Sequence, residues 1–167
     1  MNNYLLSIDP SIKNTGFTLW ENKKPIWIKS YSFNNKKLDF IDFQGEIFFQ
    51  RKRDEDIDLI IERGTFHSKN GIGYETQEHL RGFIAGQFNK LITKDMLISP
   101  SEWKKWYVNN IKNNYNLPKK QEFRWIKNTS IQLANELINE QNWNITISNH
   151  DEADSLLIGW YYLNKEN

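Results

Sequence analysis

Apolar residues fall into short runs that predict a sheet. The run from Tyr4 to Ile8 is typical of a buried strand, and Asp9 ends it. Alternating apolar residues predict two further strands at 17–20 and 26–31, and the short links favour an antiparallel meander. The run 57–61 predicts a fourth strand whose last residue is Glu62, and 96–98 predicts a short fifth strand.

Helical spacing predicts the elements that cover this sheet. Apolar residues recur at that spacing over 38–48, 77–91, 101–114, 119–140 and 151–164. Segment 63–73 contains several glycines and predicts an exposed loop. A crossover helix at 38–48 makes the fourth strand parallel to the first. We therefore predict one α/β domain over 1–167, with a five-stranded mixed sheet of three antiparallel strands and then two parallel strands, flanked by helices.

Four carboxylates stand at the ends of predicted elements. Asp9 and Glu62 end two parallel strands, which places them at one sheet edge, where open α/β sheets hold their active sites. Asp151 and Asp154 are three residues apart at a helix start and share a face. The two helix acids and Glu62 each have a structural alternative, because helix starts favour acids and Glu62 could pair with Arg63 or Arg81. A charge at the strand end before Pro10 and Ser11, as at Asp9, has few structural uses. Together the four acids predict a cluster around divalent metal ions.

Charge is distributed unevenly along a chain whose formal net charge is +1. Segment 103–128 carries seven basic residues and one acidic residue, interleaved with tryptophan and tyrosine. Cations beside aromatic rings suit a phosphate backbone and exposed bases, although two solvated helices with aromatic inner faces would give the same pattern. The chain has no cysteine, which excludes disulfides and cysteine zinc sites. No apolar run is long enough for a membrane helix. We expect a cytoplasmic protein, or one in the host-cell cytoplasm if a phage or virus encodes it.

Three stretches together resemble a known family. They are Ser-Ile-Asp-Pro-Ser at 7–11 with Thr15 and Gly16 after it, Ile-Ile-Glu at 60–62, and His-Asp-Glu-Ala-Asp at 150–154. In these stretches, in length and in element order, the chain resembles the RuvC family of Holliday-junction resolvases, within the ribonuclease-H-like superfamily. It departs from the family at Ser11, where glycine is usual. Its segment 103–106 is more similar to divergent phage-type or viral members.

The resemblance implies a ribonuclease-H-like fold and a magnesium-dependent endonuclease that resolves four-way DNA junctions in recombination and repair. It implies that Asp9, Glu62, Asp151 and Asp154 are the catalytic, metal-binding carboxylates. Two Mg²⁺ ions, with Mn²⁺ as a substitute, would activate water and stabilise the leaving oxygen. His150 is an accessory candidate that could help to position the water or hydrogen-bond at the helix start.

Further residues are predicted to contact branched DNA. The candidates are the bases of the 103–128 segment and two residues of the loop after Glu62: Lys104, Lys105, Lys119, Lys120, Arg124, Lys69 and Phe66. Phe66 could wedge between bases at the branch point. Symmetric cleavage of a junction needs two active sites, so a homodimer is expected. Gly82 and Gly86 on helix 77–91 are the interface candidates, unless they pack on the sheet of their own subunit.

Three other functions fit parts of the sequence. A broader nuclease for flaps or forks would use the same acids, and a non-catalytic DNA-binding module would keep the fold but is expected to lose an acid. An actin-like ATPase also has a first strand that ends in aspartate, but it needs two domains and glycine-rich phosphate loops. A motor partner is not predictable from the sequence.

Overall fold

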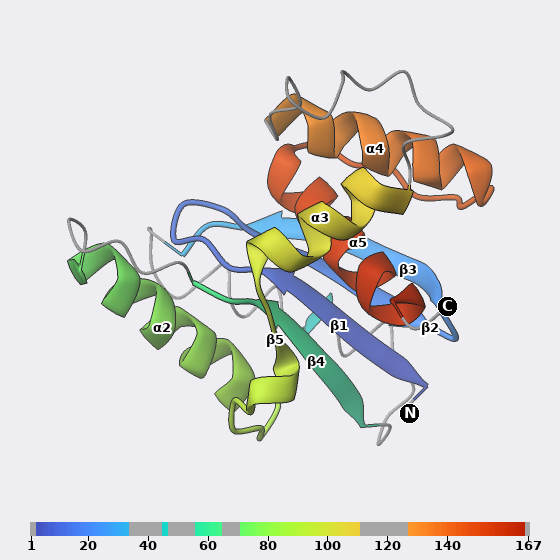
Figure 1. Ribbon diagram of the computed structural model, residues 1–167. Helices are drawn as coiled ribbons and strands as arrows, with labels where there is room; N and C mark the ends of the chain where they lie inside the picture. Colours follow the sequence, from blue (N-terminus) through green and yellow to red (C-terminus); the bar gives the residue numbers. More distant parts are fainter. Residues whose placement is uncertain (1–2, 34–44, 47–55, 65–70, 111–126, 166–167) are drawn as a thin grey trace.

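The computed structural model describes residues 3–33, 45–46, 56–64, 71–110 and 127–165, which Figure 1 draws as coloured ribbon. Five strands form one sheet in the order β3-β2-β1-β4-β5. The strands are β1 (Tyr4–Asp9), β2 (Thr15–Glu21), β3 (Lys24–Tyr31), β4 (Ile57–Glu62) and β5 (Leu97–Ile98). β1, β2 and β3 pair antiparallel, whereas β4 and β5 pair parallel to their neighbours. The predicted mixed sheet is confirmed.

The second and third strands are longer than the apolar pattern predicted. The link between the strands predicted at 17–20 and 26–31 shrinks to Asn22 and Lys23, whose φ angles are 50° and 65°. Two residues with positive φ form the tight hairpin turn whose twist matches that of the strands. Alternation alone misses such strand ends, because the flanking positions are polar.

Of the described helices, α2 (Gly71–Gly86) differs most from its predicted boundaries, and residues 111–114 and 119–126 of two other predicted helices lie outside the described residues. Helices α3, α4 and α5 span Pro100–Asn110, Lys127–Glu140 and His150–Asn164. The prediction of 77–91 for α2 was wrong at both ends. Glycine lowers helix stability without forbidding a helix, so residues 71–73 are helical rather than loop. The left-handed Asn89 lies beyond the helix end. The helix predicted at 38–48 falls almost entirely outside the described residues.

Helices cover the two faces of the sheet unequally, as Figure 1 shows: α2 lies on one face, and α3, α4 and α5 lie on the other. Alternate residues of one strand therefore enter different cores. Leu6 and Ile8 of β1 pack in the core that contains Leu80 and Ile84 of α2. Leu5 packs in the core formed with α3, α4 and α5. No helix within the described ranges is long and apolar enough to cross a membrane.

A buried polar network fixes α5 on the sheet. The Ser7 hydroxyl donates to the Ser155 carbonyl at 2.7 Å, and Trp20 Nε1 donates to Ser7 Oγ at 2.8 Å. The hydroxyls of Thr18 and Ser155 lie 2.8 Å apart. Gly159 allows this close packing, because a Cβ atom there would lie 2.3 Å from Trp20 Nε1. These contacts set the register of α5 and carry its first turn to the carboxyl end of β1.

Candidate acidic site at the carboxyl edge of the sheet

Asp9 and Glu62 lie side by side at the ends of adjacent strands. The parallel register pairs Ile8 with Ile61, so the next residue of each strand reaches the same edge. The charge of Glu62 raises the pKa of Asp9, so the two carboxyl groups lie within electrostatic range of each other. This neighbourhood follows from the predicted topology, in which a crossover places β4 beside β1.

The first turn of α5 reaches the same edge. The Asn149 side chain caps the helix and accepts from the backbone N–H groups of Asp151 and Glu152, each at 3.0 Å. Gly16 of β2 permits the approach, because a Cβ atom at that position would lie 1.9 Å from the Asp151 carbonyl oxygen. Helix and sheet therefore touch through backbone here, which is possible only beside glycine.

Two side chains hold the Asp151 carboxylate. Asn14 Nδ2 donates to Oδ2 at 2.7 Å, and His150 Nε2 lies 3.2 Å from Oδ1. Sequence reasoning did not find Asn14, which is 137 residues from its partner. Glu152, between the two aspartates, is also buried, but its carboxylate accepts from Ser30 Oγ at 3.0 Å and is satisfied elsewhere.

Asp154 completes the cluster from the next turn of α5. Its Oδ1 atom is buried and has no hydrogen-bond partner among the described residues. A buried acceptor without a donor is costly. Its carboxylate repels those of Asp9 and Glu62, which places all three within electrostatic range of one another. The structure thus brings Asp9, Glu62, Asp151 and Asp154 together.

Burial and mutual repulsion perturb the acids. Burial, followed by repulsion from Glu62, Asp154 and Asp151, raises the pKa of Asp9 well above its usual value. Burial also raises the pKa of Glu62 to about 7 and, chiefly through the same effect, raises that of Asp154. A shared shift of this kind is typical of carboxylates crowded into one functional site.

Lys104 lies close enough to act on this cluster. Its ammonium lowers the pKa values of Asp9, Glu62 and Asp154, partly offsetting burial. It also lies 4.9 Å from the centre of the Trp103 ring. Sequence reasoning placed Lys104 in a basic DNA-contacting segment, and did not place it beside the acids.

The remaining predicted DNA contacts divide into two groups. Lys105 is exposed on α3 and lines an open hollow of about 530 Å³ together with Trp106, Tyr161 and Lys165. The others lie outside the described residues: Phe66, Lys69, Lys119, Lys120 and Arg124.

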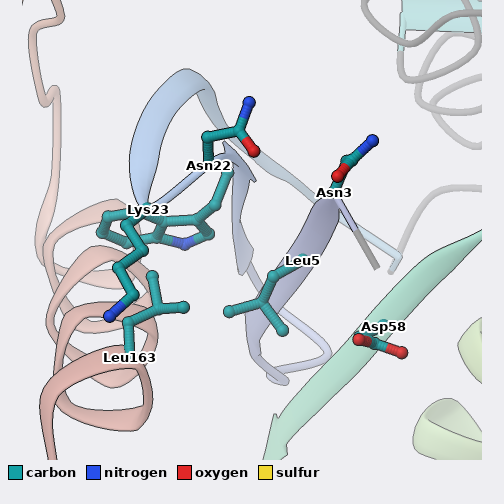
Figure 2. A pocket seen from close by; sticks show the side chains of 7 residues that line it. Asn3, Leu5, Asn22, Lys23, Asp58 and Leu163 are labelled. Atoms are coloured by element: carbon teal, nitrogen blue, oxygen red, sulfur yellow. The ribbon is translucent and has the colours of Figure 1, made fainter. Parts of the chain in front are cut away.

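A cavity of about 330 Å³ opens beside the strand ends, and Asp9, Glu62, Gly64 and Arg81 contribute to its lining. A second cavity, of about 190 Å³, lies at the opposite ends of the strands and is shown in Figure 2. Asn22 and Lys23 of the hairpin turn border it, and Asp58 is its one acidic residue. The cavity beside the acidic cluster therefore lies at the carboxyl ends of β1 and β4, and the second cavity lies at their amino ends.

The donor atoms suit a hard divalent cation in type, because carboxylate oxygens are the ligands that Mg²⁺ prefers. A cation would relieve the repulsion among the acids and would satisfy the unpartnered Asp154 Oδ1. As the side chains stand, no three acidic or histidine residues in the described part of the chain form a ready metal-ligand set. The chemistry of the cluster therefore fits a metal, and its present spacing does not yet form a coordination shell.

The predicted interface glycines face away from the sheet. Among the described residues, no atom lies within 4 Å of a Cβ built on Gly82 or Gly86. Phe83, between them, is 47% exposed. Packing against the described part of the subunit's own sheet therefore does not explain these glycines, and none of the described elements covers this face of α2.

Similarity to solved structures supports the fold. No family model matches the chain, and no curated protein matches it. Among solved structures, Thermus thermophilus RuvC in complex with a Holliday-junction substrate is 11% identical, with a TM-score of 0.54 over 96% of this chain and 95% of that one. A second Thermus thermophilus RuvC structure is 13% identical, with a TM-score of 0.53 over the same shares. The yeast mitochondrial Holliday-junction resolvase Ydc2 is 18% identical, with a TM-score of 0.50 over 93% of this chain and 78% of that chain. The chain has the RuvC-type, ribonuclease-H-like fold.

Proposed function

We propose that this protein is a metal-dependent endonuclease that resolves four-way DNA junctions. One observation carries the proposal: the fold gathers Asp9, Glu62, Asp151 and Asp154 at one sheet edge, although they are far apart in sequence. Such crowding costs stability, and carboxylates with shifted pKa values that cluster in this way are typical of functional sites. A solved protein with the same fold binds a Holliday junction, which makes branched DNA the best-supported substrate.

Asp9, Glu62 and Asp154 would hold the ions, with Mg²⁺ preferred and Mn²⁺ as a substitute. When bound, a pair of such ions would supply activation of a water and stabilisation of negative charge for phosphodiester hydrolysis. The chain itself supplies orientation. Asp9 is central because it interacts with each of the other acids. Asn14 and His150 fix the two oxygens of Asp151, which suits that residue to orient a ligand or a water.

The positive charges give the site a way to bind DNA. The charge of Lys104 acts within the acidic cluster, where an ammonium can contact a phosphate of the bound strand. Lys105 is exposed further along α3 and would contact the backbone outside the site. Phosphate contacts of this kind give affinity that falls with salt and carries no sequence preference.

The open face of α2 is the proposed interface of a homodimer. Gly82 and Gly86 leave room for a second helix to approach, and the exposed Phe83 supplies apolar surface between them. Two sites related by a two-fold axis would cut two strands of a junction symmetrically. Sedimentation of the purified protein tests this, and a monomer at all concentrations would contradict it.

The decisive experiment compares four-way, forked and linear DNA, each with Mg²⁺ and with EDTA, and maps the cuts. We expect paired cuts near the centre of the four-way junction, in Mg²⁺ only. Asp9→Asn and Asp154→Asn should abolish cleavage while junction binding persists. Asp58→Asn is the matched control, because Asp58 lies on the same strand as Glu62 but at its other end.

Each other outcome has a defined meaning. Equal cleavage of forks and junctions would favour a broader branched-DNA nuclease acting through the same acids. Binding without cleavage in any metal would identify a non-catalytic DNA-binding module. If Asp9→Asn cleaves as well as the wild type, the acidic cluster is not the active site.

A further inference from the structure

Arg81 is a buried charge that the proposed chemistry has not used. Only 2% of the residue is exposed. Burial lowers its pKa, and the carboxylates of Glu78 and Glu62 partly restore it. A guanidinium is retained in such a position only when it is fully hydrogen-bonded and paired.

The guanidinium joins a strand end to a turn of α2. Arg81 Nε donates to the backbone carbonyl of Glu62 at 2.9 Å. Nη1 donates to Glu78 Oε1 at 2.8 Å, and Nη2 lies 3.5 Å from Gln77 Oε1. Its donors point in fixed directions from a rigid plane. The contact to β4 is therefore made with the peptide that carries Glu62, while the carboxylate of Glu62 remains available to the site.

The chain leaves space for this arrangement. A Cβ atom on Gly64 would lie 2.9 Å from Arg81 Nη1 and 3.1 Å from Glu78 Oε1. Any side chain at position 64 would therefore press on the guanidinium. Arg81 and Gly64 also line the 330 Å³ cavity together with Asp9 and Glu62, so the clamp forms one wall of the acidic site.

We propose that Arg81 is a positioning residue: by clamping the Glu62 peptide, it sets where the Glu62 carboxylate stands relative to Asp9 and thereby the affinity of the site for a divalent cation. The inference rests on the proposed function, because it assumes that these acids bind such a cation. Arg81 differs from the catalytic acids in that it acts through the backbone of Glu62.

Charge and position predict opposite results. If Arg81 acted only through its charge, its removal would make the site more negative and cation binding tighter, because Glu62 and Asp9 would lose a nearby positive charge. If Arg81 positions Glu62, its removal weakens cation binding. Arg81→Lys separates the two effects, because lysine keeps the charge but cannot reproduce the forked contacts.

The test measures Mn²⁺ affinity of the full-length protein without DNA, from the electron paramagnetic resonance signal of free Mn²⁺. Mutation of a residue that supports a metal ligand typically weakens metal affinity by about 10- to 100-fold. We therefore expect about a tenfold weakening of Mn²⁺ binding for Arg81→Met and Arg81→Lys. Gly64→Ala, which keeps the guanidinium but displaces it, should weaken binding several-fold. Glu75→Gln is the control: Glu75 is exposed on the same helix as Arg81, does not line the cavity and should leave affinity unchanged.

A double-mutant cycle with Glu62→Gln shows whether Arg81 acts through Glu62. Once Glu62→Gln is present, Arg81→Lys should have little further effect on Mn²⁺ affinity, because residues that act as one unit are not additive. Additive effects, wild-type affinity of Arg81→Lys, or tighter binding by Arg81→Met would each overturn the inference. If Arg81→Met does not fold, Gly64→Ala and Arg81→Lys carry the test.

Failure of the proposed function has a different signature. The metal site is absent, and both proposals fall, if the wild-type protein does not bind Mn²⁺ or if Asp9→Asn binds as much Mn²⁺ as the wild type. If that Mn²⁺ is bound and junctions are cleaved, but Arg81→Lys matches the wild type, the positioning role alone falls.

Discussion

Replacing Glu62 with glutamine should stabilise the metal-free protein, and should do so more strongly at neutral and higher pH than at pH 5. The folded-state pKa of Glu62 is raised from 4.5 to about 7. A carboxyl whose pKa is raised on folding gives stability that is present below pH 4.5 and is lost as the pH rises through 7. From these two pKa values, ionisation of Glu62 lowers the free energy of unfolding by about 1 kcal/mol at pH 5 and about 3 kcal/mol at pH 8. Glu62→Gln removes the ionisation and therefore this cost.

Urea unfolding, followed by tryptophan fluorescence in EDTA, measures the effect. The free energy of unfolding of Glu62→Gln should exceed that of the wild type by about 2 kcal/mol more at pH 8 than at pH 5. The change in this stability difference between pH 5 and pH 8 is what matters. A difference that is the same at both pH values would come only from replacing a carboxyl group with an amide. Glu75→Gln, at an exposed position of α2, is the control and should show no such contrast. A difference that is equal at both pH values would show that the Glu62 carboxyl carries no penalty for burial and repulsion.

Added Mg²⁺ should reduce the contrast, because cation binding relieves the same repulsion. The wild type should gain stability from Mg²⁺ at pH 8, whereas Glu62→Gln should gain less. Equal gains in the two proteins would place the bound ion away from Glu62.

Three further predictions use other contacts. Gly159→Ala should destabilise the protein by roughly 1–3 kcal/mol in urea unfolding, because the new Cβ would lie 2.3 Å from Trp20 Nε1; wild-type stability would show that the packing can relax. Asn149→Ala should cost about 1 kcal/mol, because two capping hydrogen bonds are lost; an unchanged urea midpoint would contradict the cap. Lys104→Met should move the acidic limb of the cleavage–pH profile to higher pH, because Lys104 lowers the pKa values of the acids; an unmoved limb would remove Lys104 from the site.

The sheet and the acidic edge could be predicted because they depend on strong rules. Strands of period two and one crossover connection determine which strand ends meet. Asp9 and Glu62 follow from that topology, and the three-residue spacing of Asp151 and Asp154 needs only a helix. The family resemblance supplied the same four residues from short motifs.

The supporting residues could not be predicted, because they depend on distances and rotations that a pattern does not encode. The burial of Trp103 and Tyr107, four residues apart, sets the rotation of α3 about its axis and carries Lys104 toward the acids. That spacing was visible in the sequence, but the direction in which α3 crosses the sheet was not. The Asn14–Asp151 hydrogen bond joins segments that no local rule connects.

Gly16 shows how the two halves of the acidic site remain in contact. Its missing side chain lets the beginning of β2 touch the backbone of Asp151 directly. A methyl group at this position would act as a wedge, forcing the last helix away from the strand that ends at Asp9. Such a variant would keep every acidic residue and every basic residue, and yet hold the two pairs of carboxylates too far apart to share a ligand. Loss of activity in a random-mutation screen should therefore map to this residue as sharply as to the acids themselves.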